Sequence, residues 1–260
     1  MKEASLTDLL DVAICAAEAA GKYALANHHR RSEVVETFPH DVKHILDLEC
    51  QRIAEEIIAS EYPEHGILGE ESARPNTTGS FEWIIDPIDG TVNYTHGFPY
   101  WCCSIAVRQH QKVLAGCVYA PEFEEYYTAH IEAPAKKNGV AISASHTRYL
   151  QDALIFTGLS KEFDSDRNAH FDMFRMLAMN TRKLRINGAA ALDICHVADG
   201  SSDGFYESGV YVWDFAAAGL IAEQAGANLA VYPLKDDTFT VFCTNEYLID
   251  GLRAIYTKCI

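Results

Sequence analysis

The stretch Trp83-Ile84-Ile85-Asp86-Pro87-Ile88-Asp89-Gly90-Thr91 constrains the fold more than any other part of the chain. Three bulky apolar residues in a row predict a buried strand, so the acids that follow emerge at its end. Pro87 fixes its own φ at about −65° and biases Asp86 towards an extended backbone, which limits where the two carboxylates point. Gly90 permits a sharp turn and presents bare amides that can hold a phosphate at a helix start. The stretch therefore indicates a phosphate bridged by metal ions.

Glu70 and Glu71 form a second acidic pair, directly after another short apolar run. Adjacent glutamates are most often a solvated surface pair. Here, however, both acidic clusters follow predicted strands, and two strand ends in one sheet would bring Glu70, Asp86 and Asp89 together.

Asp214 is the fourth acidic element, at the start of an apolar helix of small residues that runs from Trp213 to Gly219. The simpler interpretation is a helix-capping aspartate, which stabilises by about 1 kcal/mol. The alternative is a carboxylate that points across at a metal ion, with the Ala and Gly surface allowing close backbone packing.

The charge balance excludes several classes of partner. The 260 residues include 21 Lys and Arg against 37 Asp and Glu, a formal charge of −16. Such a field repels nucleic acid and anionic membrane surfaces, so we expect neither as a partner. An anionic ligand would need a positive group that the amino-acid count does not supply, and metal cations are the obvious candidates.

Cysteine usage and hydropathy predict a cytoplasmic protein. The eight cysteines include no C-x-x-C pair, and most lie in apolar stretches, as buried thiols do. Asp8 and Asp11 interrupt the first apolar stretch, which does not suit a secretory leader. No uncharged apolar run approaches the roughly 18 residues of a membrane span.

Periodicity predicts a mixed α/β chain (α+β) without internal repeats or long linkers. An antiparallel meander is expected before a half in which strands and helices alternate, which suggests stacked sheet and helix layers. The expected helices span residues 6–21 (or to 28), 46–58, 168–179, 188–197, 213–225 and 246–258. The expected strands span residues 66–69, 83–85, 102–108, 113–119, 125–129, 153–157, 183–186, 204–207 and 238–244.

Three spaced motifs resemble those of the inositol monophosphatase family: residues 69–72, residues 83–96, and Trp213-Asp214 with the small residues up to Gly226. The resemblance covers most of residues 40–226. It implies a lithium-sensitive, Mg²⁺-dependent phosphomonoesterase with the layered α-β-α-β-α sandwich of the fructose-1,6-bisphosphatase superfamily. It further implies a homodimer of single catalytic domains, residues 1–260, with packed sub-regions at roughly 1–150 and 151–260.

By this resemblance, six residues belong to the metal site: Glu70, Glu71, Asp86, Ile88 (through its carbonyl), Asp89 and Asp214. Glu70, Asp86 and Ile88 would hold a first Mg²⁺. Asp86, Asp89 and Asp214 would hold a second, and Glu70 would bind a loose third ion through water. Oxygen ligands of this kind suit a hard cation that keeps several waters.

The resemblance also implies catalytic and substrate-binding roles. Asp47 would order Thr91, and Glu70 with Thr91 would position and deprotonate the attacking water. The implied substrate-binding residues are Asp89, Gly90, Thr91, Gly188, Ala189, Glu207 and Arg185. For Arg185, a surface ion pair is the simpler interpretation.

The chain departs from the family pattern before Asp47. Animal members carry a lysine about eleven residues upstream, where this chain has Glu36. Lys43 is the candidate to take over the positive role. The departure affects the expected third ion more than the reaction class.

Three readings of the function stay open. Inositol 1-phosphate is the first choice of substrate, and histidinol phosphate is the main rival because histidinol phosphatases share all three motifs. A nucleoside bisphosphate would call for a larger insertion. The remaining alternative is a metal-binding regulatory protein without turnover. The presence of both Thr91 and Asp47 favours catalysis over this alternative.

Overall fold

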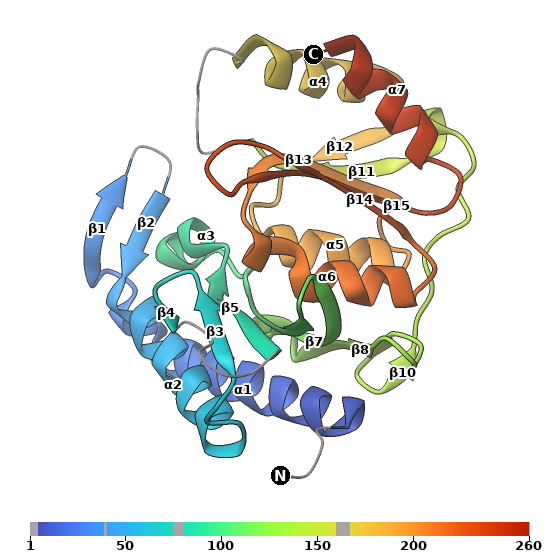
Figure 1. The fold of residues 1–260 in the computed structure, drawn as a ribbon. Helices are drawn as coiled ribbons and strands as arrows, with labels where there is room; N and C mark the ends of the chain where they lie inside the picture. The colour runs from blue at the N-terminus through green and yellow to red at the C-terminus, as the bar shows by residue number, and fades with distance from the viewer. Residues whose placement is uncertain (1–4, 39–40, 75–80, 160–166, 260) are drawn as a thin grey trace.

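The computed structural model describes residues 5–38, 41–74, 81–159 and 167–259, and these form five layers (Figure 1). The layers are, in order, α1 (Leu6–Ala26) with α2 (Ile45–Glu61), an eight-stranded sheet, α5 (Ala190–Ala198) with α6 (Val212–Gln224), a five-stranded sheet, and α4 (Arg167–Asn180) with α7 (Ile249–Cys259). The mixed α/β class and the α-β-α-β-α arrangement are thereby confirmed.

The eight-stranded sheet has the order β10-β9-β8-β7-β6-β5-β3-β4, and only the β3–β5 pair is parallel. Its strands are β3 (Gly66–Gly69), β4 (Ala73–Arg74), β5 (Phe81–Asp89), β6 (Cys102–Gln109), β7 (Lys112–Ala120), β8 (Glu125–His130), β9 (Lys136–Lys137) and β10 (Val140–Ala141). The expected meander is β6–β7–β8.

The five-stranded sheet has the order β12-β11-β13-β15-β14, and its first three strands are parallel. Its strands are β11 (Leu154–Thr157), β12 (Lys183–Arg185), β13 (Gly204–Val210), β14 (Asn228–Pro233) and β15 (Phe239–Thr244). Outside the two sheets lie the hairpin of β1 (Val34–Phe38) and β2 (Asp41–His44), the short helix α3 (Thr91–His96), and 3₁₀ turns at His28–Arg30, Pro121–Phe123 and Leu150–Asp152.

The helices form layers because each packs its apolar surface against a sheet. The side chain of Ser5 accepts the amide of Asp8 at 3.1 Å and starts α1, whose buried stripe packs on one face of the larger sheet. Helix α6 is apolar on all sides from Phe215 to Ala222, as a helix buried between two sheets must be. A Cβ on Gly116 of β7 would lie 3.0 Å from Ala217, so small residues set this close approach.

The expected elements are present to within a few residues, and the missed ones are short or irregular. The missed elements are β1, β2, β4, β9, β10, β14, α3 and the 3₁₀ turns. Helix α3 has six residues and follows Gly90 at φ +93°, too short a helix to show a period. Strand β14 is an edge strand that ends in proline, where no ladder hydrogen bond is lost.

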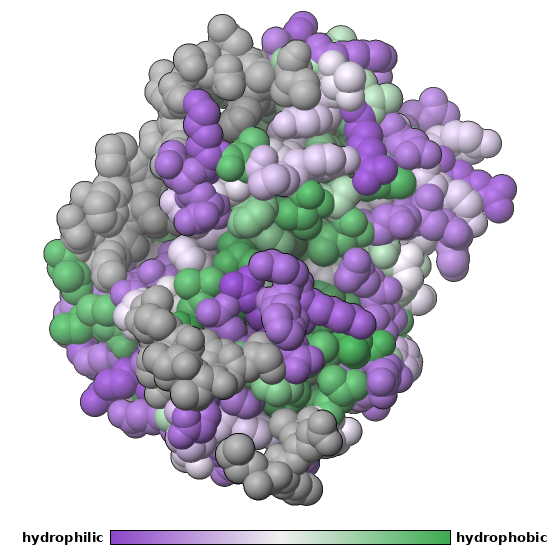
Figure 2. All heavy atoms as spheres, in the orientation of Figure 1, coloured by the Kyte–Doolittle hydropathy of each residue, from purple (hydrophilic) through white to green (hydrophobic). Residues whose placement is uncertain are grey.

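Apolar side chains lie around the middle of the face shown in Figure 2. A cavity of about 520 Å³ beside α6 is lined mainly by apolar residues, among them Ile84, Phe215, Leu220, Val231 and Phe239. None of the acids singled out from the sequence is among its lining residues. In the parts of the chain that the structure describes, no helix is both long and apolar enough to cross a membrane.

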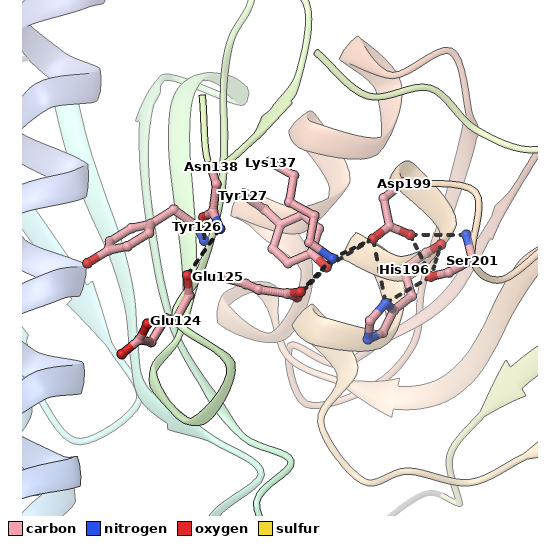
Figure 3. A network of polar contacts seen from close by, with 9 residues as sticks. All are labelled: Glu124, Glu125, Tyr126, Tyr127, Lys137, Asn138, His196, Asp199 and Ser201. Atoms are coloured by element: carbon pink, nitrogen blue, oxygen red, sulfur yellow. Dashed lines mark hydrogen bonds and ion pairs between the residues drawn. The ribbon is translucent and has the colours of Figure 1, made fainter. Parts of the chain in front are cut away.

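A polar network joins the larger sheet to the end of α5 (Figure 3). The Lys137 ammonium lies 2.8 Å from Glu125 and 3.0 Å from Asp199, the residue that follows α5. The hydroxyl of Tyr127 lies within hydrogen-bond distance of the same two carboxylates, 2.9 Å from Glu125 and 3.1 Å from Asp199. Burial alone would raise the pKa of Asp199, but the nearby His196, 3.8 Å away, and hydrogen bonds from Ser201 and Lys137 hold that pKa below its usual value. The network therefore anchors α5 at its C-terminal end through an ionised carboxylate.

We expect Lys137→Met to lower the free energy of unfolding by about 2 kcal/mol, because two half-buried carboxylates lose their cation. Urea denaturation followed by circular dichroism measures this change. Lys136→Met is the matched control on the same strand, because Lys136 is exposed, and its effect should stay within about 0.5 kcal/mol. Equal losses in the two variants would contradict the anchoring role.

Candidate active site

The two acids of β5 lie on one face of the sheet because the strand is irregular between them. Asp86 pairs with Ser104 of β6 and Asp89 pairs with Cys102, so three steps along β5 match two along β6. In a regular strand, residues three apart point to opposite faces, and the extra residue returns Asp89 to the face of Asp86. Pro87, which has no amide hydrogen for the ladder, lies within this irregularity.

That face is turned towards α5 and α6. Ile84, two residues before Asp86, packs in the core that contains both helices. The hydroxyl of Ser104 donates to the carbonyl of Trp213 in α6 at 3.3 Å. Asp86 is 2% exposed and Asp89 is 8% exposed. Both carboxylates are therefore buried between the sheet and the helix layer.

Glu70 follows the last residue of the neighbouring strand β3 and lies beside Asp86 of β5. Strand β3 runs parallel to β5 with Gly69 paired to Ile85, and the amide of Glu70 donates to the carbonyl of Ile85 at 3.1 Å. Because Gly69 and Ile85 are paired in parallel strands, the residues that follow them, Glu70 and Asp86, are neighbours. The backbones of these two acids therefore lie side by side, as the sequence predicts. The strand expected over residues 83–85 continues to Asp89, so Asp86 and Asp89 lie within β5 and do not emerge beyond its end.

Asp89 is held by the first turn of α5. Its carboxylate accepts the amide of Ala190 at 3.2 Å and the amide of Ala191 at 2.7 Å. These amides begin the helix and have no partner within it, so an anion is favoured at this end. Sequence reasoning placed this loop near Asp89 but did not predict that the carboxylate would bond α5.

Gly90 packs against the residues that precede α5. A Cβ on Gly90 would lie 3.1 Å from the Cβ of Ala189 and 3.2 Å from the carbonyl oxygen of Gly188. Residues 89–90 and 188–189, all predicted to contact substrate, are therefore neighbours in space.

Asp214 is the third residue of α6, and one of its oxygens accepts the amide of Tyr211 at 2.7 Å. Asp214 therefore caps the helix as the third residue of a capping box, with Tyr211 at the N-cap position, and its role as a metal ligand remains a prediction. Its charge also reaches β5: burial raises the pKa of Asp89 to about 7, and the negative charge of Asp214 adds to this effect. Burial and then the charges of Asp89 and Asp86 raise the pKa of Cys102. Asp86, Asp89 and Asp214 thus share one electrostatic neighbourhood.

Asp47 and Thr91 occupy the starts of α2 and α3. Asp47 is 1% exposed and accepts the amide of His44 at 2.9 Å, while the hydroxyl of Thr91 donates to the carbonyl of Ile88 at 2.9 Å. The predicted ordering of Thr91 by Asp47 remains a prediction. His44 and Thr95, which sequence reasoning missed, connect the two helices: imidazole Nε2 lies 2.6 Å from the Thr95 hydroxyl, which donates to the carbonyl of Thr91.

Two further polar side chains, the part-buried Asn93 and the buried Asp193, link segments that are far apart in the sequence. The amide of Asn93 in α3 donates to the carbonyls of Tyr100 and Asn187, both at 2.7 Å. Asp193 in α5 accepts the hydroxyl of Tyr100 at 2.5 Å and the side-chain amide of Asn187 at 2.8 Å. Burial raises the pKa of Asp193 to about 7. Sequence reasoning missed this function of Asn93 and Asp193, because it depends on contacts about 90 residues apart.

Glu207 and Arg185 lie towards the carboxyl ends of parallel strands in the smaller sheet, the usual place for ligands in such sheets. The Glu207 carboxylate fills the space that a Cβ on Gly158 would need, since that atom would lie 2.1 Å away. Arg185 is exposed, and its guanidinium donates to the carbonyl of Leu184 at 3.2 Å. Contact of either residue with substrate remains a prediction.

The six predicted metal ligands fit a hard cation in chemistry, since all supply oxygen. Within residues 5–38, 41–74, 81–159 and 167–259, no three His, Cys, Asp or Glu side chains enclose a metal position as they stand. Asp89 and Asp214 each accept hydrogen bonds from backbone amides in this arrangement. The shared ligation remains a prediction. Glu36 and Lys43 pair across β1–β2, but their side chains lie outside the described residues.

Comparisons with known proteins agree with this geometry. The model of the inositol monophosphatase family matches residues 5–245. An inositol monophosphatase of Dictyostelium discoideum is 34% identical over 98% of this chain and 97% of its own length. The Nus factor SuhB of Haemophilus influenzae is 35% identical over 85% of this chain and 84% of its own. The crystal structure of the extragenic suppressor protein suhB from Bartonella henselae superposes with a TM-score of 0.90 at 28% identity, covering 96% of this chain and 98% of that one.

With the family matched along nearly the whole chain and its fold reproduced, this protein belongs to the inositol monophosphatase family and is a phosphomonoesterase of a generally metal-dependent kind.

Proposed function

We propose that this protein hydrolyses the phosphate ester of a small polyol, with inositol 1-phosphate as first choice, and that it requires two or three Mg²⁺ ions. The observation that carries the proposal is the burial of Asp86 and Asp89 on one face of β5, within reach of the charge of Asp214. Like charges buried together are stabilised by a cation. The name of the Dictyostelium relative supports the choice of an inositol phosphate.

The proposed ligands are those that the family resemblance implies. Glu70, Asp86 and the carbonyl of Ile88 would hold one ion, and Asp86, Asp89 and Asp214 a second. Glu70, with Glu71 beside it, would hold a weaker third. Ile88 can serve because a carbonyl oxygen has two lone pairs, and the Thr91 hydroxyl uses only one. Bound Mg²⁺ would offset the negative charge of the phosphate oxygens and lower the pKa of a bound water.

The chain's own residues position the reactants. Glu70 and Thr91 would orient the attacking water and accept its proton, and Asp47 would fix Thr91. The first amides of α5 favour an anion beside Asp89. Phosphoryl transfer asks little covalent chemistry of the protein, so positioning of this kind carries most of the catalysis.

The leaving group would lie between the two halves of the chain. Gly90, Gly188 and Ala189 are small and leave room there, Glu207 would receive a substrate hydroxyl, and Arg185 would lie at the rim. Both sub-regions contribute, so the proposal includes one catalytic domain over residues 1–260. It also includes a homodimer in the cytoplasm and inhibition by lithium.

We expect Asp86→Asn to lower kcat by at least about 100-fold, because loss of outer partners of a metal ligand already costs 10- to 100-fold and Asp86 would ligate two ions. Phosphate release at saturating Mg²⁺ measures this, and circular dichroism checks the fold. Asp172→Asn on the outer helix α4 is the control, because the Asp172 side chain is 47% exposed, and it should keep wild-type turnover. Turnover by Asp86→Asn within tenfold of wild type would overturn the site.

The raised pKa of Asp89 predicts the pH dependence of stability without metal. The folded protein keeps a proton on Asp89 between about pH 4 and pH 7 that the unfolded chain has lost, so stability falls as pH rises through this window. Asp89→Asn should show a shallower fall. Urea unfolding at pH 4.5 and 7.5 in EDTA measures both slopes, and Mg²⁺ at pH 7.5 should stabilise the wild type more than the variant. Identical slopes would contradict the argument.

A phosphate-release panel with Mg²⁺ tests the substrate. Inositol 1-phosphate should give the highest kcat/KM among inositol 1-phosphate, histidinol phosphate, fructose 1,6-bisphosphate and adenosine 3′,5′-bisphosphate. A preference for histidinol phosphate would replace the substrate and keep the reaction. No turnover of any substrate, with Mg²⁺ bound, would favour the regulatory reading.

A further inference from the structure

Helix α2 presents two buried polar side chains one turn apart, and the proposed mechanism uses only the first. Asp47 is 1% exposed and Gln51 is 2% exposed, and residues four apart lie on the same helix face. A buried amide is costly unless its donors and acceptor are bonded. Gln51 must therefore have a specific set of partners, and the structure gives them.

The amide of Gln51 is bonded to the turn that carries the acidic pair. Its oxygen accepts the backbone amide of Glu71 at 2.9 Å. Its nitrogen lies 2.7 Å from the hydroxyl and 3.1 Å from the carbonyl of Ser72, and 2.8 Å from a Glu55 oxygen. A Cβ on Gly69 would lie 2.4 Å from the same amide group, so the side chain rests directly on the turn's backbone.

The other side of this turn is held by β5. The amide of Glu70 donates to the carbonyl of Ile85 at 3.1 Å, and the amide of Gly69 donates to the carbonyl of Ser72 at 2.9 Å. The backbone between Gly69 and Ser72 is thus fixed by a strand on one side and by Gln51 on the other. Gln51 is the side chain of α2 whose contacts span this turn from Gly69 to Ser72.

We infer that Gln51 is a positioning residue that holds the Glu70–Glu71 turn in place and thereby sets the affinity of the site for its cation. The inference rests on the proposed function, because Glu70 and Glu71 are proposed ligands there. A neutral amide suits this position. It accepts from one backbone amide and donates to the next residue, and it adds no further negative charge beside Glu55, Glu70 and Glu71.

The test is the Mg²⁺ affinity of Gln51→Met, measured by isothermal titration calorimetry without substrate. Methionine has a similar length and makes none of these hydrogen bonds, so the dissociation constant should rise about tenfold or more. At saturating Mg²⁺, kcat and the KM for substrate should return to within about threefold of wild type. A purely structural residue would lower the melting temperature without changing the Mg²⁺ affinity.

Two companion variants sharpen the result. Ile58→Ala, a core change on the same helix away from the turn, should lower the melting temperature and leave the Mg²⁺ affinity unchanged. Gln51→Asn keeps an amide but withdraws it by one methylene from the Glu71 amide, so it should show the same loss and serves if the methionine variant does not fold. Wild-type Mg²⁺ affinity in a folded Gln51 variant overturns the inference.

Asp86→Asn, titrated alongside, separates this inference from the proposed function. Loss of Mg²⁺ binding in Asp86→Asn with wild-type binding in Gln51→Met overturns only the role of Gln51. Unaltered Mg²⁺ binding in Asp86→Asn overturns the proposed site, and the inference falls with it.

Discussion

The irregular pairing of β5 with β6 decides where this protein's buried charges lie. Without the extra residue, Asp86 and Asp89 would point to opposite faces, and one carboxylate would enter the apolar core beneath α1 and α2. With it, Ile88 is buried in that core while both acids face α5 and α6. The irregularity in β5 thus places the apolar side chain of Ile88 on one face of the sheet and the two carboxylates on the other. Gly90 and helix α3 follow directly after it in the chain.

Burying these acids has an electrostatic cost that the fold only partly offsets. Burial and the charge of Asp214 raise the pKa of Asp89, and the amide of Ala191 opposes the rise. A lysine or arginine would neutralise the acids permanently and fill the space with a long side chain. In the proposed function, a dissociable cation would neutralise them and still leave coordination positions for phosphate oxygens, which suits a chain of formal charge −16.

Local pattern was enough to assign the acids to single elements of the fold. Asp86 and Asp89 follow a run of apolar residues in one strand, and Asp214 lies in the first turn of a helix of small residues. The irregular pairing that places Asp86 and Asp89 on one face was not predicted, because it depends on β6. His44, Gln51 and Asn93 carry no such signal. Their roles depend on partners 20 to about 95 residues away, such as Thr95 for His44, the 69–72 turn for Gln51 and Asn187 for Asn93. The hairpin β1–β2 and helix α3 were missed because each is too short to show a period.

The N-termini of α5, α6 and α2 lie near Asp89, Asp214 and Asp47. Their contribution is judged by comparing the free energy that a helix N-terminus provides with the free energy cost of burying a carboxylate. Helix α5 gives two amides to Asp89, α6 begins two residues before Asp214, and α2 begins two before Asp47. A helix start stabilises a nearby negative charge by about 0.3–1 kcal/mol, and up to about 2 kcal/mol when partly buried. Removing a carboxylate from water costs several kcal/mol. The helix starts can therefore orient the acids and lessen the cost of burying them without removing it, and in the proposed function a bound cation would offset the remainder.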